Sequence, residues 1–143
     1  MKDIISDLQI SNSEPHVVFG RVDTCVDPPE RVKWSTSLYV LKAPRYCLVD
    51  VDWRNYISTG IYIKSAVGVK ITAFAPADRN FDSNVISKSS EMLINIHCHS
   101  ELRFNTGQLY PEFSGRRIEF HEGDPICFLE VSLLPRLNVS GVE

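Results

Sequence analysis

Three histidines and a glutamate are the residues whose types and spacing are suited to binding a metal ion. The stretch INIHCHSE, residues 94–101, places His97 and His99 two positions apart, with Glu101 close behind. Side chains two apart on a β-strand point to the same face. His121 ends a second stretch with the same alternation. If the two stretches are neighbouring strands, three imidazoles and one carboxylate converge, which is a common ligand set for zinc or iron.

The step from His97 to His99 resembles the first metal motif of the cupins, which are double-stranded β-rolls. This resemblance implies a metal-dependent enzyme with a divalent metal as cofactor, using His97, His99 and His121, with Glu101 as a fourth group. The cupin glutamate, however, comes several residues after the second histidine, whereas Glu101 follows Ser100 directly. The second cupin motif has no recognisable counterpart in the sequence. The other interpretation, which we favour, is the polar, solvent-facing side of an ordinary strand.

The elements that would position these side chains are β-strands. Apolar and polar residues alternate with a period of two in most of the chain, and turn-forming residues such as DPPE and HEGDP separate the alternating stretches. These stretches are 16–26, 31–42, 46–53, 60–75, 91–104, 116–120 and 125–134. Helical periodicity is confined to residues 2–9. The pattern predicts an all-β fold, a single-domain antiparallel β-sandwich or jelly roll with little helix.

Length and composition set the outer limits. The chain has 143 residues, 43% of them hydrophobic and 23% charged, with a net charge of −3. These values predict one β domain over residues 1–143, with flexible ends at 1–12 and 136–143 and a long loop at 75–90. No basic face indicates nucleic acid, and no apolar run is long enough to span a membrane. We expect a cytoplasmic protein, either cellular or viral in a host cell.

Cysteines and tryptophans are expected in the core. Cys25, Cys47, Cys98 and Cys127 are widely spaced, so we expect them to be reduced, and three of them lie in apolar strand-like stretches. The alternation places Trp34 and Trp53 on apolar strand faces as well. Gly68 interrupts the longest alternating stretch and predicts a bulge or a bend there.

The segment 107–131, GQLYPEFSGRRIEFHEGDPICFLEV, is the most patterned part of the sequence. It resembles the closing β segment of the dUTPase and dCTP-deaminase family, and its last fifteen residues resemble uncharacterised phage and bacterial β-rich domains. Five residues fall on steps of the family's glycine-aspartate-aromatic motif, and Gly123-Asp124 matches its later turn. The five are Gly107, Leu109, Pro111, Phe113 and Gly115. The resemblance implies a β-roll that closes with a hairpin at HEGDP.

The sequence departs from that family where its chemistry lies. The family's aspartate, which holds the nucleotide sugar, falls on Tyr110 here. The serine-rich phosphate motif and the glycine-rich C-terminal arm are not evident either. A third interpretation nevertheless stays open, in which the protein binds a nucleotide or another small molecule through residues 107–124 and the face that carries Asp50 and Asp52.

Other candidate binding residues are carboxylates, aromatic rings and one arginine. Asp50 and Asp52 lie about 7 Å apart if both belong to one strand, a spacing suited to a cation or to acid–base chemistry. Tyr39 and Tyr62 fall on the polar strand phase and are suited to a partner surface. Arg117 faces the same side as His121.

No complete catalytic signature accompanies these residues. We therefore expect a non-catalytic binding or protein-interaction module, of a phage-related and oligomeric kind. It would have a protein partner or associate with itself, and it would need no cofactor.

Overall fold

Antiparallel strands make up nearly all of the regular structure. The computed structural model describes residues 14–33, 35–76 and 86–135. The strands are β1 (His16–Arg21), β2 (Glu30–Arg31), β3 (Leu38–Lys42), β4 (Cys47–Asp50), β5 (Tyr56–Ser58), β6 (Ile61–Val67), β7 (Val69–Pro76), β8 (Ile86–Leu93), β9 (Arg103–Asn105), β10 (Arg117–Phe120) and β11 (Pro125–Leu133). One short helix, α2 (Thr106–Leu109), and one 3-10 turn, η1 (Pro111–Phe113), lie between β9 and β10. The prediction of an all-β fold with little helix is confirmed.

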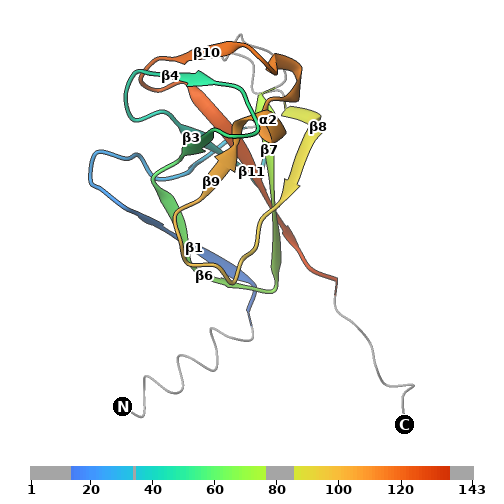
Figure 1. Ribbon diagram of the computed structural model, residues 1–143. Helices are drawn as coiled ribbons and strands as arrows, with labels where there is room; N and C mark the ends of the chain where they lie inside the picture. The colour runs from blue at the N-terminus through green and yellow to red at the C-terminus, as the bar shows by residue number, and fades with distance from the viewer. Residues whose placement is uncertain (1–13, 34, 77–85, 136–143) are drawn as a thin grey trace.

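The strands form one larger sheet and three two-stranded ribbons. The larger sheet has the order β2-β3-β11-β7-β8, and the ribbons are β1-β6, β4-β10 and β5-β9. Figure 1 shows β4 and β10 at one end of the molecule and β1 and β6 at the other. Among the described residues, no helix is long and apolar enough to cross a membrane.

Strand β11 is the central strand of the larger sheet and is largely buried. Its first five residues are all buried, as expected for a strand that is covered on both faces. Cys127 and Leu129 contribute to the main core, whereas Phe128 points the other way and packs with Val32, Leu38 and Val40 in a second cluster. β11 pairs with β3 on one side and with β7 on the other.

Two turns lie where glycine predicted them. Gly68 separates β6 from β7 and has a φ of 68°, a backbone angle that favours glycine. Gly123 has a φ of 89° in the turn between β10 and β11. Asp124 completes that turn, since its carboxylate accepts a hydrogen bond from the backbone N–H of His121 at 2.7 Å. The expected bend is therefore confirmed. The turn at HEGDP is also present, but the prediction of a closing hairpin is wrong, because β10 pairs with β4 whereas β11 pairs with β3 and β7.

Two predicted strands are shorter than expected, for the same physical reason. Asn95 accepts the backbone N–H of His97 at 3.0 Å, and Asp52 accepts the backbone N–H of Arg54 at 2.7 Å. A side chain that bonds the backbone two residues on forms a turn in place of the ladder. The strand predicted across 91–104 therefore ends at Leu93, and the one predicted across 46–53 ends at Asp50.

These early strand ends correct several predictions about the core. Trp53 was expected to be buried, but it lies in the turn and is 68% exposed. Trp34 lies outside the described residues, as do the predicted flexible ends and residues 77–85 of the predicted long loop. The rest of that loop is partly strand, since β7 continues to Pro76 and β8 begins at Ile86.

The four cysteines are free, as predicted, but only one of them is buried. Cys127 lies in the core, where burial raises the pKa of its thiol. Cys98, expected on a core face, is exposed, and hydrogen bonding from the backbone N–H of Ser100 lowers the pKa of its thiol. The correction again follows from the early end of β8.

The thiols should therefore react with iodoacetamide in a fixed order. Because the thiolate is the nucleophile, Cys98 is expected to be alkylated first at neutral pH, and Cys127 only after the core opens. Peptide mass spectrometry over time measures this order. Alkylation of Cys127 in the native protein as fast as that of Cys98 would contradict the described core.

Candidate functional site

The segment after β9 is held by a buried threonine. The side-chain oxygen of Thr106 accepts the backbone N–H of Asp52 at 3.0 Å and lies 2.9 Å from the carbonyl oxygens of Asp50 and Asp52. Asn105 caps α2 by accepting the backbone N–H of Gln108. These contacts fix the turn after β4 against α2.

Gly107 has a packing role in the same junction. A Cβ placed on it would lie 3.1 Å from the backbone carbon of Asp52 and from the backbone nitrogen of Trp53. Backbone cannot move aside as the end of a flexible side chain can. A side chain at this position would have to push two backbone segments apart by a few tenths of an ångström, so close packing favours glycine here.

Tyr110 occupies the position at which the motif of the dUTPase-like family has an aspartate. Its ring is buried, and its hydroxyl donates to the carbonyl oxygen of Ile126 at 2.7 Å. Burial raises the pKa of this phenol well above its ordinary value. The hollow bordered by Pro76 and residues 109–113 has a volume of only about 10 Å³, room for one water molecule at most. In this chain Tyr110 acts as a core residue.

The four predicted metal ligands each have a different set of neighbours. His97 borders an apolar groove, and His99 Nδ1 lies 3.0 Å from the carbonyl oxygen of Ile63. Glu101 accepts the backbone N–H of Gly60 at 2.8 Å, whereas His121 pairs with Glu119 at 2.9 Å.

The strand pairing that would have gathered these ligands does not form. β10 pairs with β4, not with the strand that leads to His97. Among the described residues, no group of three or more histidine, cysteine, aspartate or glutamate side chains could hold a metal ion.

Asp50 and Asp52 do not form a carboxylate pair. Asp50 accepts a hydrogen bond from Arg117 Nε at 2.8 Å across β4 and β10, and both side chains are exposed. The carboxylate of Asp52 instead accepts the backbone N–H of Arg54 in the turn that follows β4. An exposed ion pair of this kind contributes little stability.

Tyr39 and Tyr62 belong to different environments. Tyr39 is half-buried, with its ring centroid 6.2 Å from that of Phe19. The ring of Tyr62 covers Gly20, where a Cβ would lie 2.3 Å from the ring. The structure therefore does not bring the two tyrosines together as one exposed platform.

A groove around Arg45 has the size and the chemistry of a ligand site. It has two adjoining halves of about 380 Å³ and 230 Å³, which share Pro44, Arg45 and Ser58. Small-molecule sites are commonly clefts of about 300–1,000 Å³ with mostly apolar walls and a few polar groups. We refer to this concavity as the Arg45 groove.

Both halves of the Arg45 groove combine apolar walls with polar groups, but only the larger half carries carboxylates. The larger half carries the carboxylates of Asp23 and Glu101, beside Thr59 and Gly60. Hydrogen bonding from the backbone N–H of Cys25 lowers the pKa of Asp23, so this carboxylate is charged near neutral pH.

The smaller half has an apolar floor and an aromatic edge. Cys47, Val49, Ile57 and Ile126 form the floor, and Tyr56 lies at the edge. The guanidinium of Arg103 lies 5.5 Å from the ring centroid of Tyr56, a cation–π distance that holds the ring in place.

Arg45 lies at the junction of the two halves and is exposed. It takes part in none of the ion pairs among the described residues. Its charge is therefore available to an anionic ligand, in a groove that also offers an aromatic ring and two carboxylates.

Sequence reasoning did not single out the Arg45 groove. Arg45, Tyr56 and Ser58 come from two separate segments, and no spacing rule connects them. The only signal in the sequence was chemical, an arginine after the turn-forming KAP and a tyrosine before STG. Glu101 was selected, but for a metal site with histidines that the fold places elsewhere.

The sequence matches no protein-family model. No curated protein is significantly similar to it in sequence. Solved structures do match the fold, and among them are dUTPases of staphylococcal phages.

A mutant dUTPase of phage 80alpha, studied for the link between its enzymatic activity and its SaPI-inducing capacity, matches with a TM-score of 0.59 at 12% identity, over 86% of this chain and 94% of that one. A second 80alpha dUTPase mutant, with dUpNHpp, gives 0.56 at 13% identity over the same shares of the two chains. A mutant dUTPase of phage phi11 of S. aureus, described for a structural Mg(II) ion, gives 0.57 at 13% identity, over 86% of this chain and 95% of that one.

These neighbours confirm the weak resemblance and correct two expectations. At such low identity they show the fold, and the segment 107–131 that resembled this family belongs to that fold. The expectation of a non-catalytic module conflicts with neighbours that are enzymes, and is wrong on this comparison. The expectation that no cofactor is needed conflicts with the structural Mg(II) ion of one neighbour and is corrected likewise.

Proposed function

We propose that this protein is an enzyme that binds a nucleoside triphosphate in the Arg45 groove and acts on its phosphate chain. The observation that carries the proposal is the placement of Arg45, an exposed cation without an ion pair among the described residues. It lies where the half of the groove that carries two carboxylates meets the half that carries Tyr56. The fold supports the proposal, since the dUTPases that share it act on such a nucleotide.

The groove suggests how the ligand would lie. A base and its sugar suit the smaller half, where Tyr56 offers a ring edge and four side chains offer an apolar floor. The phosphates would then cross Arg45, whose planar guanidinium can bind phosphate oxygens in pairs. Ser58, shared by both halves, is placed to hydrogen-bond the ligand between base and phosphates.

A magnesium ion fits this arrangement only together with the nucleotide. The described residues form no metal cage by themselves. Magnesium in nucleotide enzymes is commonly held by one or two carboxylates together with substrate phosphates. Asp23 and Glu101 are the two carboxylates in the larger half and would be its protein ligands. Once bound, the ion would neutralise charge on the phosphate oxygens.

The segment at Tyr110 is not part of the proposed site. Its hollow has no room for a base, and Tyr110 itself is committed to Ile126. A nucleotide site that uses this segment would require the core to open. The family resemblance and the ligand groove therefore lie in different parts of the same fold.

Replacement of Arg45 should weaken nucleotide binding selectively. We expect Arg45→Gln to reduce the affinity for dUpNHpp with magnesium by at least about tenfold, because charge-assisted hydrogen bonds are lost. Isothermal titration measures the affinity. Arg116→Gln is the matched control, an exposed arginine beside the segment 107–115 and outside the groove.

The two variants separate the two places where a nucleotide could bind. Weaker binding in Arg45→Gln and unchanged binding in Arg116→Gln support the groove. The opposite result would move the site to the segment that resembles the dUTPase family. Self-association, the other expectation from sequence, remains part of the proposal, and light scattering on the same samples measures it.

A further inference from the structure

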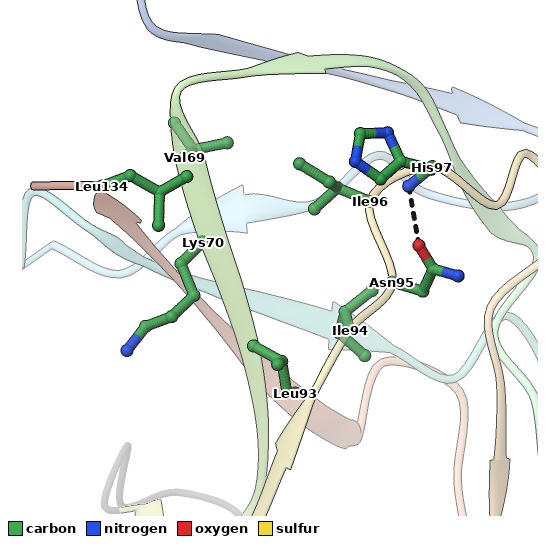
Figure 2. Close-up of a pocket in the computed structure, with 8 residues that line it drawn as sticks. All are labelled: Val69, Lys70, Leu93, Ile94, Asn95, Ile96, His97 and Leu134. Carbon is green, nitrogen blue, oxygen red and sulfur yellow. Dashed lines mark hydrogen bonds between the residues drawn. The ribbon is translucent and has the colours of Figure 1, made fainter. Parts of the chain in front are cut away.

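An apolar groove separate from the Arg45 groove lies beside the start of β7. It has a volume of about 440 Å³ and lies between β7, the residues after β8, and the end of β11. Figure 2 shows Val69, Leu134 and Ile96 around this hollow, with Leu93 at its other end. We refer to it as the Leu93 groove.

The exposed apolar side chains of the Leu93 groove are contiguous. Leu93 is 68% exposed and Leu134 is 50% exposed, although both border the same hollow. Among the described residues that line the groove, the polar ones are Lys70, Asn95 and His97, and none carries a carboxylate. A contiguous apolar surface with a basic side chain at its rim is suited to an apolar segment that carries acidic residues.

The chain enters the described structure next to this groove. A Cβ placed on Gly68 would lie 3.4 Å from Pro15, so Pro15 packs against the bend between β6 and β7. The backbone N–H of Leu134 donates to the carbonyl oxygen of the same Gly68 at 3.0 Å. Val69, the next residue, lines the groove. The residues that precede Pro15 in the sequence therefore begin within a short reach of the hollow.

The sequence of those residues has the required chemistry. Residues 3–8 read Asp-Ile-Ile-Ser-Asp-Leu. Ile4 and Leu8 are four apart, as are Asp3 and Asp7, so a single helical turn presents an apolar pair beside an acidic pair. The five residues 9–13 span at most about 18 Å when extended, which suffices to return the segment to the groove.

We propose that residues 3–8 dock in the Leu93 groove of their own chain, with Ile4 and Leu8 against the leucines and with Asp3 or Asp7 beside Lys70. The apolar contacts supply the stabilisation, since an exposed carboxylate–lysine pair adds little. The proposal does not depend on the nucleotide site.

Thermolysin tests the docking in the full-length protein, because it cleaves before leucine and isoleucine, the residues that would be covered. We expect cleavage within residues 3–10 to be about tenfold faster in Leu93→Asp than in the unmodified protein, because cleavage follows the population of the open form. Leu133→Asp is the matched control, since Leu133 is 70% exposed and lies outside the groove. It should leave the rate unchanged.

Three results would overturn the proposal. The first is equal cleavage of the unmodified protein and Leu93→Asp. The second is an equal acceleration in both variants, which would indicate general destabilisation. The third is protection that increases with protein concentration, which would show that a second copy supplies the segment. Circular dichroism of each variant confirms that the fold is retained, as expected for two exposed positions.

Discussion

Tyr110→Asp should cost the protein about 5 kcal/mol of folding free energy, a large part of the stability of a domain of this size. The substitution places the family's carboxylate where this chain has its tyrosine. It removes a buried ring whose centroid lies 6.0 Å from that of Phe120, and the hydrogen bond to Ile126. It also places a carboxylate without a cationic partner in an apolar core.

Urea denaturation of Tyr110→Asp and Tyr110→Phe measures this effect. The phenylalanine variant keeps the ring and loses only the hydroxyl, so we expect a loss of about 1–2 kcal/mol. A Tyr110→Asp protein as stable as the unmodified one would contradict the structural role of Tyr110. It would reopen the segment 107–115 as a nucleotide site.

Thr106→Val should cost about 2 kcal/mol, which is more than a change of one small side chain usually does. Valine has nearly the same shape, so the effect isolates the hydroxyl. Without it, the backbone N–H of Asp52 loses its acceptor, and the converging carbonyl oxygens lose their shared donor. The turn after β4 would then separate from α2.

Thr24→Val is the control for this prediction. Thr24 is exposed, and its one side-chain hydrogen bond is a long one, 3.4 Å, to the neighbouring Asp23. We expect its stability to change by less than about 0.5 kcal/mol. If Thr106→Val denatures at the same urea concentration as this control, the buried hydroxyl is not what holds the junction.

The alternation of apolar and polar residues correctly predicted which side chains of the paired strands are buried. It did not predict where the strands end. Ile118 and Phe120 are buried while Arg117 and Glu119 are exposed, as a period of two requires. Ile94 still donates its backbone N–H to the carbonyl oxygen of Ile71, but Ile96 continues the alternation although the pairing with β7 has ended. The side chain of Asn95 decides this, and an alternation pattern does not reveal which asparagine will form a turn.

The candidate site was harder to predict than the fold because its residues are brought together only by strand pairing. Ser58 and Arg103 are neighbours because β5 pairs with β9, a pairing that spacing along the chain does not indicate. The predicted histidine metal site was wrong because the expected strand and strand pairing do not form. Their spacing suggested one face, but their segment is a turn, and β10 pairs elsewhere.

The most direct test of the proposed function is phosphorus NMR of dUTP with magnesium and the purified protein. We predict that the triphosphate signals disappear at a rate proportional to protein concentration, and that Arg45→Gln slows this loss while Arg116→Gln does not. Unchanged triphosphate signals with the folded, unmodified protein, for dUTP and for the other nucleoside triphosphates, would contradict the assignment of the Arg45 groove as an enzyme active site.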